Sequence, residues 1–311
     1  MKIKLLSYWV IKLLIVFVVL VSIGSITTQR AVAQRTITIS PSTIKQNLDP
    51  GQTIIGTIGI TNGSLTPINF KTSIQDYAVF DTNGTPNLLP SNYPDKKHSA
   101  SSWLIITPDT FAVLPHEKGI LNYYLQVPLD ARPGGHYAAV TFTPYDKASS
   151  ESGAIVQERI AALFYISING EIEEQARVNI FSTDQFFEYG PIQIKTQIKN
   201  LGDLHIVPEG KIIISDLLGR TIQENELSKF NIFPLSARDY TNTIGQKLMI
   251  GRFKATLLAS YGENNNLPIT AALYFWVIPW KLAILAILSL IIVVLGTIYL
   301  KRRKPTLTPK I

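Results

Sequence analysis

Hydrophobic and polar residues alternate one by one along several short segments of the chain. In residues 68–75, Ile, Phe, Thr and Ile alternate with Asn, Lys, Ser and Gln, which is the period of a strand with one buried face. Residues 54–60 place Ile or Gly at every second position, and Asn62–Gly63 stands between the two segments. Because Asn-Gly is a common tight-turn pair, this pattern predicts a β-hairpin. Further apolar segments follow at residues 103–106, 121–127, 137–142 and 160–168, separated by Pro and Gly signals.

The same alternation restarts in residues 192–199 and stops at Asn200-Leu201-Gly202-Asp203. Residues 211–215, a Leu218–Gly219 turn, residues 252–261 and a last strand from Ile269 follow. Short strands at this spacing predict an all-β protein of two tandem immunoglobulin-like β-sandwiches. We expect the first sandwich over residues 34–170 and the second over 171–278, with the boundary near Asn169–Gly170. The longest irregular stretch is residues 80–102, and long loops in compact domains often bind ligands.

A different pattern closes the chain. Residues 282–300 carry no formal charge, and a helix of that length spans about 28 Å, close to the hydrocarbon core of a bilayer. The sequence therefore predicts a transmembrane helix over residues 279–300, against the alternative of a buried core helix. Trp276 and Trp280 precede the uncharged stretch of residues 282–300 as interfacial anchors, and residues 301–311 form a tail. The basic cluster that fixes the tail in the cytoplasm consists of Lys301, Arg302, Arg303 and Lys304.

The other end of the chain predicts the same topology. Residues 1–33 combine a basic leader, an apolar core and the small-residue site Ala31-Val32-Ala33, which is typical of a signal peptide. An uncut N-terminal anchor is the alternative. With cleavage after Ala33, we expect a single-pass protein of the cell membrane. Its ectodomain lies outside the cytoplasm and its C-terminus lies inside.

Charge and cysteine content narrow the classes of function. Nine of the 29 Lys and Arg residues lie in the leader and the tail, so the exported part holds 20 basic against 22 acidic residues. This balance removes the support that a pI near 9.4 would give to nucleic-acid binding. The chain has no cysteine, which excludes disulfides and thiolate chemistry. The sequons at Asn62 and Asn83 are both Asn-Gly pairs, and we interpret them as turns.

Ten short motifs mark strand ends and turns along both predicted sandwiches. They are Pro50-Gly51-Gln52, Thr61-Asn62, Asp76-Tyr77, Asp81-Thr82-Asn83-Gly84, Trp103-Leu104, Leu114-Pro115, Val127-Pro128, Pro133-Gly134-Gly135-His136-Tyr137, Asn200-Leu201-Gly202 and Pro208-Glu209-Gly210. With these motifs, the chain resembles the WxL-interacting surface proteins of Gram-positive bacteria and, more loosely, pilus-chaperone-like immunoglobulin-like sandwiches. The WxL resemblance implies a peptidoglycan-binding sandwich, a second sandwich that binds a host protein, a transmembrane helix and a basic tail.

Residues with catalytic or ligating chemistry are scattered along the sequence. The four histidines, His98, His116, His136 and His205, show no metal-binding spacing, and no nucleophile or phosphate-binding motif is present. We expect no catalytic residue, no cofactor and no metal site. Asp76, Asp81 and Asp95 could bind calcium across the long loop, but they match no calcium-loop pattern and we interpret them as solvated turns. Within this loop, we predict a contact region at Asp95, Lys96 and Lys97.

These features lead to one hypothesis and two alternatives. The hypothesis is a non-enzymatic, membrane-anchored surface protein whose sandwiches bind cell-wall polymer or another surface protein, and so serve adhesion or tethering. The first alternative is a chaperone-like or assembly component for exported subunits. The second is an accessory of a cell-wall hydrolase. Paired aromatic residues at Tyr123–Tyr124 and Phe186–Phe187 should each place one ring on either face of a strand, so one ring of each pair can face outward.

Overall fold

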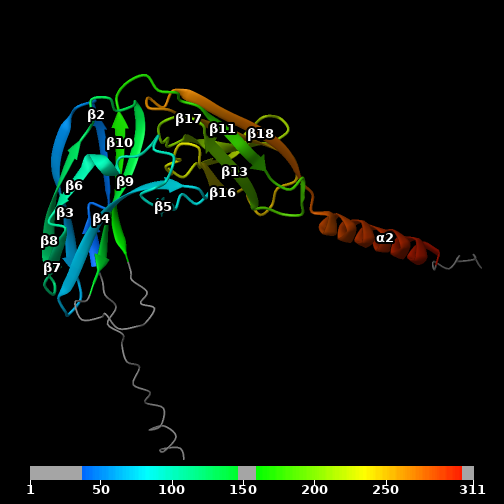
Figure 1. The fold of residues 1–311 in the computed structure, drawn as a ribbon. Coiled ribbons are helices and arrows are strands. Elements are labelled where there is room, and N and C mark those ends of the chain that lie inside the picture. Colours follow the sequence, from blue (N-terminus) through cyan, green and yellow to red (C-terminus); the bar gives the residue numbers. More distant parts are fainter. Residues whose placement is uncertain (1–36, 146–158, 303–311) are drawn as a thin grey trace, which may run out of the picture.

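Two β-sandwiches and one helix follow each other along the chain in a computed structural model (Figure 1). The structure describes residues 37–145 and 159–302. Strands make up nearly all of the regular structure before the helix, which confirms the predicted fold class. The predicted signal peptide at residues 1–33 lies outside the described residues, as do Arg303 and Lys304.

The first sandwich packs two sheets face to face. We name them the β3 sheet, of order β1-β3-β8-β6, and the β9 sheet, of order β2-β10-β9-β4-β5 with β7 also on β4. The strands are β1 (Ile37–Ser40), β2 (Thr43–Leu48), β3 (Thr53–Asn62), β4 (Ile68–Val79), β5 (Pro86–Leu88), β6 (Leu104–Thr107), β7 (Thr110–Val113), β8 (Lys118–Gln126), β9 (Gly134–Pro144) and β10 (Ile160–Ile168). A short 3-10 helix, η1 (Ser101–Trp103), precedes β6.

The core of the first sandwich comes from the inward positions of these strands. Ile58 of β3 lies opposite Leu121 of β8, and both are fully buried. Phe142 of β9 and Phe164 of β10 close the core from the other sheet. The alternation at residues 68–75 therefore marks the buried face of β4, as predicted.

One sequence prediction about this sandwich is wrong. Residues 54–60 and 68–75 do not form a hairpin, because β3 pairs with β1 and β8 whereas β4 pairs with β5, β7 and β9. The chain crosses from one sheet to the other at Asn62. The fully buried side chain of Asn62 stabilises this crossing by donating a hydrogen bond to Val113 O. An Asn-Gly pair signals a change of direction, and here the new direction leads into the opposite sheet.

The second sandwich repeats the two-layer plan with fewer strands. One sheet has the order β11-β13-β16, and the other has the order β12-β18-β17-β14-β15. Its strands are β11 (Ala176–Ser182), β12 (Phe186–Phe187), β13 (Ile192–Asn200), β14 (Glu209–Ser215), β15 (Thr221–Glu226), β16 (Ala237–Ile244), β17 (Gly251–Tyr261) and β18 (Leu267–Val277). Its separate core includes Ile194, Ile212 and Phe275. The boundary expected at Asn169–Gly170 falls between β10 and β11.

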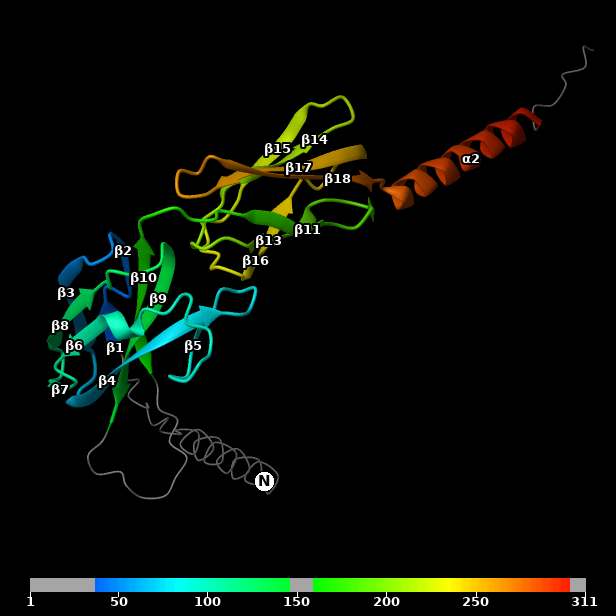
Figure 2. The same ribbon diagram turned by 45° about the horizontal axis from the view of Figure 1, so that its top comes forward.

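The last strand runs almost directly into the C-terminal helix. Only Ile278 and Pro279 separate β18 from α2 (Trp280–Arg302). The most apolar stretch within Trp280–Lys301 has a mean hydropathy of 2.8, and none of it is buried against the protein. The helix projects away from both sandwiches (Figure 2). The alternative of a core helix is therefore wrong, and α2 has the length and composition to cross a membrane.

Candidate binding site at the domain junction

An aromatic cluster joins the two sandwiches. Tyr77, Tyr137 and Tyr165 face outward from β4, β9 and β10 and meet His205 and Phe233 of the second sandwich. The ring centres of Phe233 lie 5.0 Å from Tyr137 and 5.3 Å from Tyr165, in edge-to-face geometry. Such pairs stabilise packing beyond their buried area. This contact explains why β9 is buried on both faces. The apolar run at residues 137–142 is typical of such a strand.

Polar contacts add to this junction. Tyr137 Oη accepts a hydrogen bond from the backbone N–H of His205 at 2.9 Å. The backbone N–H of Gly135 donates to Asp203 O at 2.8 Å, and that of Asp239 donates to Thr82 O at 3.0 Å. Each bond joins the first sandwich to the second. The two domains are therefore held together at several separate points rather than by a single flexible connection.

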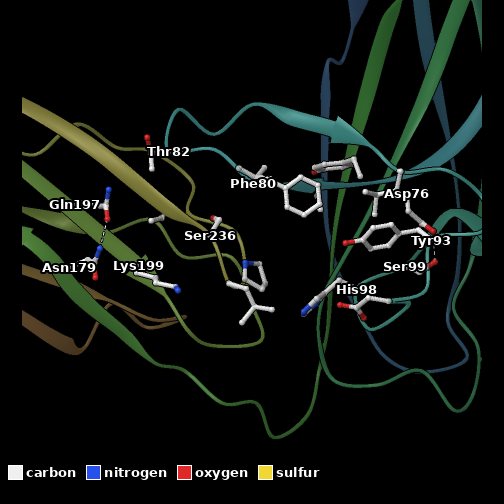
Figure 3. A pocket seen from close by; sticks show the side chains of 18 residues that line it. Asp76, Phe80, Thr82, Tyr93, His98, Ser99, Asn179, Gln197, Lys199 and Ser236 are labelled. Carbon is white, nitrogen blue, oxygen red and sulfur yellow. Dashed lines mark hydrogen bonds between the residues drawn. The ribbon is translucent and has the colours of Figure 1, made fainter.

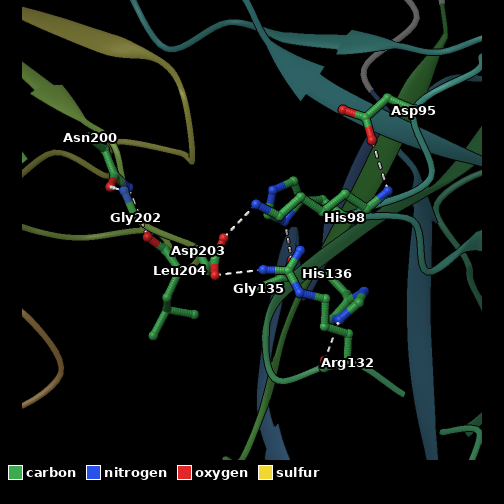
Figure 4. A network of polar contacts seen from close by, with 10 residues as sticks. Asp95, His98, Arg132, Gly135, His136, Asn200, Gly202, Asp203 and Leu204 are labelled. Carbon is green, nitrogen blue, oxygen red and sulfur yellow. Dashed lines mark hydrogen bonds and ion pairs between the residues drawn. The ribbon is translucent and has the colours of Figure 1, made fainter. Parts of the chain in front are cut away.

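An acidic side chain of the second sandwich lies between two basic side chains of the first. Asp203 Oδ1 is 2.7 Å from Lys97 Nζ, and Asp203 Oδ2 is 2.6 Å from Arg132 Nη2 (Figure 4). Partial burial alone would raise the pKa of Asp203, but the hydrogen bonds from Lys97 and Arg132 outweigh it and lower the pKa. We call this arrangement the Asp203 latch. It stays charged over the neutral range.

A buried carboxylate organises the loop that carries Lys97. Asp76 accepts hydrogen bonds from Ser99 Oγ at 2.7 Å and from the backbone N–H groups of Ala100 and Ser101 at 3.0 and 2.8 Å. Burial would raise the pKa of Asp76, and these hydrogen bonds lower it. His136 supports the same loop, because its two ring nitrogens lie 3.0 Å from Ser99 O and 2.8 Å from Arg132 O. Asp76 is thus a structural carboxylate and not part of a solvated turn.

The predicted contact region lies beside this junction, and its three residues have different surroundings. Asp95 Oδ1 accepts the backbone N–H of Lys97 at 2.9 Å. Lys96 Nζ donates to Ser91 O at 3.2 Å and lies 3.6 Å from Asp76. Lys97 belongs to the Asp203 latch, so it has a structural contact of its own. Binding by these three residues stays a prediction.

A cleft of about 410 Å³ opens between the sandwiches next to this loop (Figure 3). His98 and Lys199 point into it from opposite sides. The first sandwich contributes Phe80, Leu89, Tyr93 and Asp95 among others, and the second contributes Asn179, Gln197, Lys199, Leu235 and Ser236. The cleft combines aromatic, aliphatic and amide side chains, and its volume is in the range of ligand-binding pockets.

His98 gives the cleft a hydrogen-bond acceptor that the protein itself does not use. His98 Nδ1 lies 2.7 Å from Gly135 O, so this nitrogen carries the proton and donates it. Burial lowers the pKa of His98 and keeps the ring neutral. His98 Nε2 is buried and has no hydrogen-bond partner among the described residues. A buried acceptor without a partner is unfavourable and favours a ligand that supplies a donor.

Two of the four histidines, His98 and His205, meet at the junction although they are far apart in the sequence. His136 packs against Trp103 inside the first sandwich, and His116 lies in a turn of that sandwich. Over residues 37–145 and 159–302, no group of three or more His, Asp or Glu side chains could hold a metal ion. Sequence spacing could not reveal this gathering, because it arises from the docking of two domains.

Comparisons with known proteins add a limited result. No protein-family model and no curated protein matches the chain. Among solved structures, the class 5 fimbriae chaperone CfaA is 12% identical with a TM-score of 0.39, covering 76% of this chain and 98% of that chain. The Pseudomonas aeruginosa CupB2 chaperone is 11% identical with a TM-score of 0.37, covering 77% and 100%. The E. coli chaperone DraB is 12% identical with a TM-score of 0.34, covering 78% and 95%.

These neighbours are in line with the looser expectation of a pilus-chaperone-like sandwich. The resemblance to WxL-interacting proteins stays a prediction. With TM-scores below 0.5 and identities of 11 and 12%, the similarity identifies neither a ligand nor a function for this chain.

Proposed function

We propose that the protein is a non-enzymatic, membrane-anchored surface protein that holds an extracytoplasmic partner in the cleft between its sandwiches. The observation that carries this proposal is the unpaired, buried His98 Nε2 in a cleft to which both domains contribute. A hydroxyl or amide N–H of the partner would complete its hydrogen bonding. Cell-wall polymer and the exposed segments of surface proteins both supply such donors.

The anchor and the junction suit a tethering role. α2 follows β18 after two residues, so the second sandwich has little freedom relative to the membrane. The aromatic cluster and the Asp203 latch hold the first sandwich on the second. A partner bound in the cleft would therefore be held at a fixed place relative to the helix, which is what tethering requires.

The orientation follows from the basic cluster after the helix. Lys301, Arg302, Arg303 and Lys304 should remain in the cytoplasm, because short basic flanks resist export. Protease added to cells without an outer barrier should then remove the sandwiches and spare a tag placed after Ile311. Loss of the tag with the sandwiches intact would reverse the proposed orientation.

Binding at the cleft is tested with the full-length protein in lipid nanodiscs. Leu235 lines the cleft and is largely exposed, so Leu235→Trp should fill it without disturbing a core. We expect at least a tenfold loss of affinity for purified wall polymer or for a captured surface protein. Leu129→Trp is the matched control, since Leu129 is even more exposed and does not line the cleft. Equal affinities of the two variants would contradict the proposal.

A second variant tests the hydrogen bond itself. His98→Asn keeps an N–H donor near Gly135 O but removes the acceptor at Nε2. We expect weaker binding with an unchanged melting temperature. Saturable binding to a folded partner supports tethering. Transient capture of unfolded exported subunits alone would favour the chaperone-like alternative, and turnover of wall polymer would contradict the non-enzymatic function.

A further inference from the structure

One end of the second sandwich carries exposed apolar side chains on three separate segments. The segments are the turn between β14 and β15, the turn between β16 and β17, and the short strand β12. Their exposed apolar residues are Leu217 and Leu218, Leu248 and Ile250, and Phe186. Each of these side chains is between 67 and 77% exposed. Large apolar side chains at three adjoining tips are unusual for a surface that faces only water.

Strand register places all three segments at the end from which α2 leaves. Gly251, the first residue of β17, pairs with Val277, the last residue of β18. Phe187 of β12 pairs with the same Val277, and its carbonyl accepts the N–H of Ile278 at 2.8 Å. Ser215, the last residue of β14, pairs with Lys254 near the start of β17. The β14–β15 hairpin and the start of α2 lie at this same end (Figure 2).

At the opposite end of the same sandwich, the turn between β17 and β18 is polar, and the exposed apolar Leu235 between β15 and β16 lines the cleft. The turn between β17 and β18 is Gly262-Glu263-Asn264-Asn265-Asn266, which contains no apolar side chain. Leu235 faces the cleft between the sandwiches, whereas the exposed apolar side chains beside α2 do not line that cleft. They therefore need a different partner.

Aromatic residues complete the apolar end. Trp276 and Trp280 are exposed on either side of the junction with the helix. Tyr274 is exposed on β18 as well, and the guanidinium of Arg252 stacks on its ring at 4.4 Å. Tryptophan and tyrosine side chains are enriched at the level of lipid headgroups. Their position beside the first turn of α2 therefore suits a surface at the membrane interface.

The charges of this end favour a negatively charged partner. Among the described residues, three acidic side chains lie at this end: Glu188 is paired with Lys281 at 2.7 Å, Asp216 is paired with Arg220 at 2.7 Å, and Asp184 is exposed. The exposed basic residues Lys247 and Arg252 outnumber Asp184. Lys247 is exposed beside Leu248 in the turn between β16 and β17. Basic side chains attract the anionic headgroups of a bilayer surface.

We propose that this end of the second sandwich is a membrane-contact surface that sits in the headgroup layer beside α2, with an anionic lipid bilayer as its partner. We define the membrane-contact surface as Leu217, Leu218, Leu248, Ile250, Phe186 and Lys247. When α2 spans the bilayer, the residues level with its first turn meet lipid headgroups. The apolar tips enter the interface, and Lys247 lies among the phosphates. The ectodomain then has a fixed tilt on the membrane, with its cleft held at a defined height.

The absence of cysteine makes a direct test practical. Single variants Leu217→Cys and Leu248→Cys each carry an environment-sensitive fluorophore in the full-length protein. The protein is reconstituted in nanodiscs of phosphatidylcholine with phosphatidylglycerol, with lipids spin-labelled near the headgroup. Asn264→Cys at the opposite turn is the control. We expect blue-shifted emission and about twofold stronger quenching at the two test sites than at the control.

Further measurements separate lipid contact from contact with a second copy of the protein. Adding Lys247→Gln to the labelled Leu248→Cys protein should reduce its quenching in phosphatidylglycerol discs and leave it unchanged in pure phosphatidylcholine. Solvent-like emission at both test sites would overturn the proposal. So would a blue shift without lipid quenching that disappears on dilution of the discs, since this result would indicate a second copy as the partner. Neither readout depends on occupancy of the cleft, so failure here leaves the proposed function untouched.

Discussion

Asn62 in the first sandwich and Asn200 in the second occupy corresponding corners and make the same hydrogen bonds. Both are fully buried at the end of a strand. Each side-chain N–H₂ group donates to the carbonyl four residues later, at Thr66 or Leu204, and to a carbonyl on a distant segment. Those distant acceptors are Val113 O at 3.0 Å and Ile232 O at 2.9 Å. Each Oδ1 accepts the backbone N–H two residues on, at 2.9 Å.

The features that differ between the sandwiches teach more than this shared corner. The outward aromatic residues of β4, β9 and β10 lie on the first sandwich, and the apolar end beside α2 lies on the second. A feature present in both sandwiches is explained by what the fold itself requires. A feature present in one alone needs a neighbour: the other domain, a ligand or the membrane.

The largest expected effect concerns the shared corners. Asn62→Ala and Asn200→Ala each leave two carbonyls and one N–H without their partner in a buried place. We expect each variant to lose about 4 kcal/mol of unfolding free energy. Urea denaturation followed by tryptophan fluorescence measures this loss. Asn122→Ala, at an exposed position of β8, is the control and should change stability by less than about 0.5 kcal/mol.

Unequal losses at the two corners would break the comparison. If Asn62→Ala were nearly neutral while Asn200→Ala unfolded the second sandwich, the first crossing would depend on its neighbouring strands and not on its asparagine.

The strand faces and the helix could be predicted from the sequence, because alternation and apolar length report local burial. Pairing could not: residues 54–60 show which face is buried but not that β8 is their partner. The sequence does contain a signal for the shared corner, in Asn62-Gly63-Ser64 and Asn200-Leu201-Gly202. In each, the N–H of the third residue donates to the Oδ1 of the asparagine. The sequence contains almost no signal for the junction, since Lys97, Arg132 and Asp203 meet only after both domains have folded.

A smaller effect is expected at the junction as pH falls. Burial, and to a lesser degree the charge of Lys45, lowers the pKa of His205 to about 4. The unfolded chain binds a proton near pH 6.5 that the folded chain takes up only near pH 4, so stability falls as pH drops through this window. The loss is about 3 kcal/mol below pH 4. Burial also lowers the pKa of His98, which adds a loss of the same sign.

The variant His205→Gln isolates this contribution. Carboxylates of the junction do not obscure it, because the pKa values of Asp76 and Asp203 lie below the ordinary value for aspartate. Urea titrations between about pH 7 and about pH 4.5 should therefore show a shallower decline for the variant than for the native protein. Parallel curves would mean that His205 is hydrated in solution and that the junction is looser than its aromatic packing indicates.

The smallest expected effect separates the two roles that Lys97 could have. Lys97→Ala removes one partner of Asp203 while Arg132 remains, and we expect a loss of about 1 kcal/mol or less, since Lys97 is partly exposed. Lys96→Ala is its matched neighbour, because the polar contacts of Lys96 among the described residues are with Asp76 and Ser91 of the first sandwich. Spin labels on the two domains measure the distance across the junction. If Lys97→Ala broadens that distance and weakens partner binding while Lys96→Ala does neither, Lys97 acts by holding the cleft in shape. If both variants weaken binding at an unchanged distance, Lys96 and Lys97 touch the partner directly. In that case the first sandwich carries a ligand contact of its own, in addition to its contact with the second sandwich.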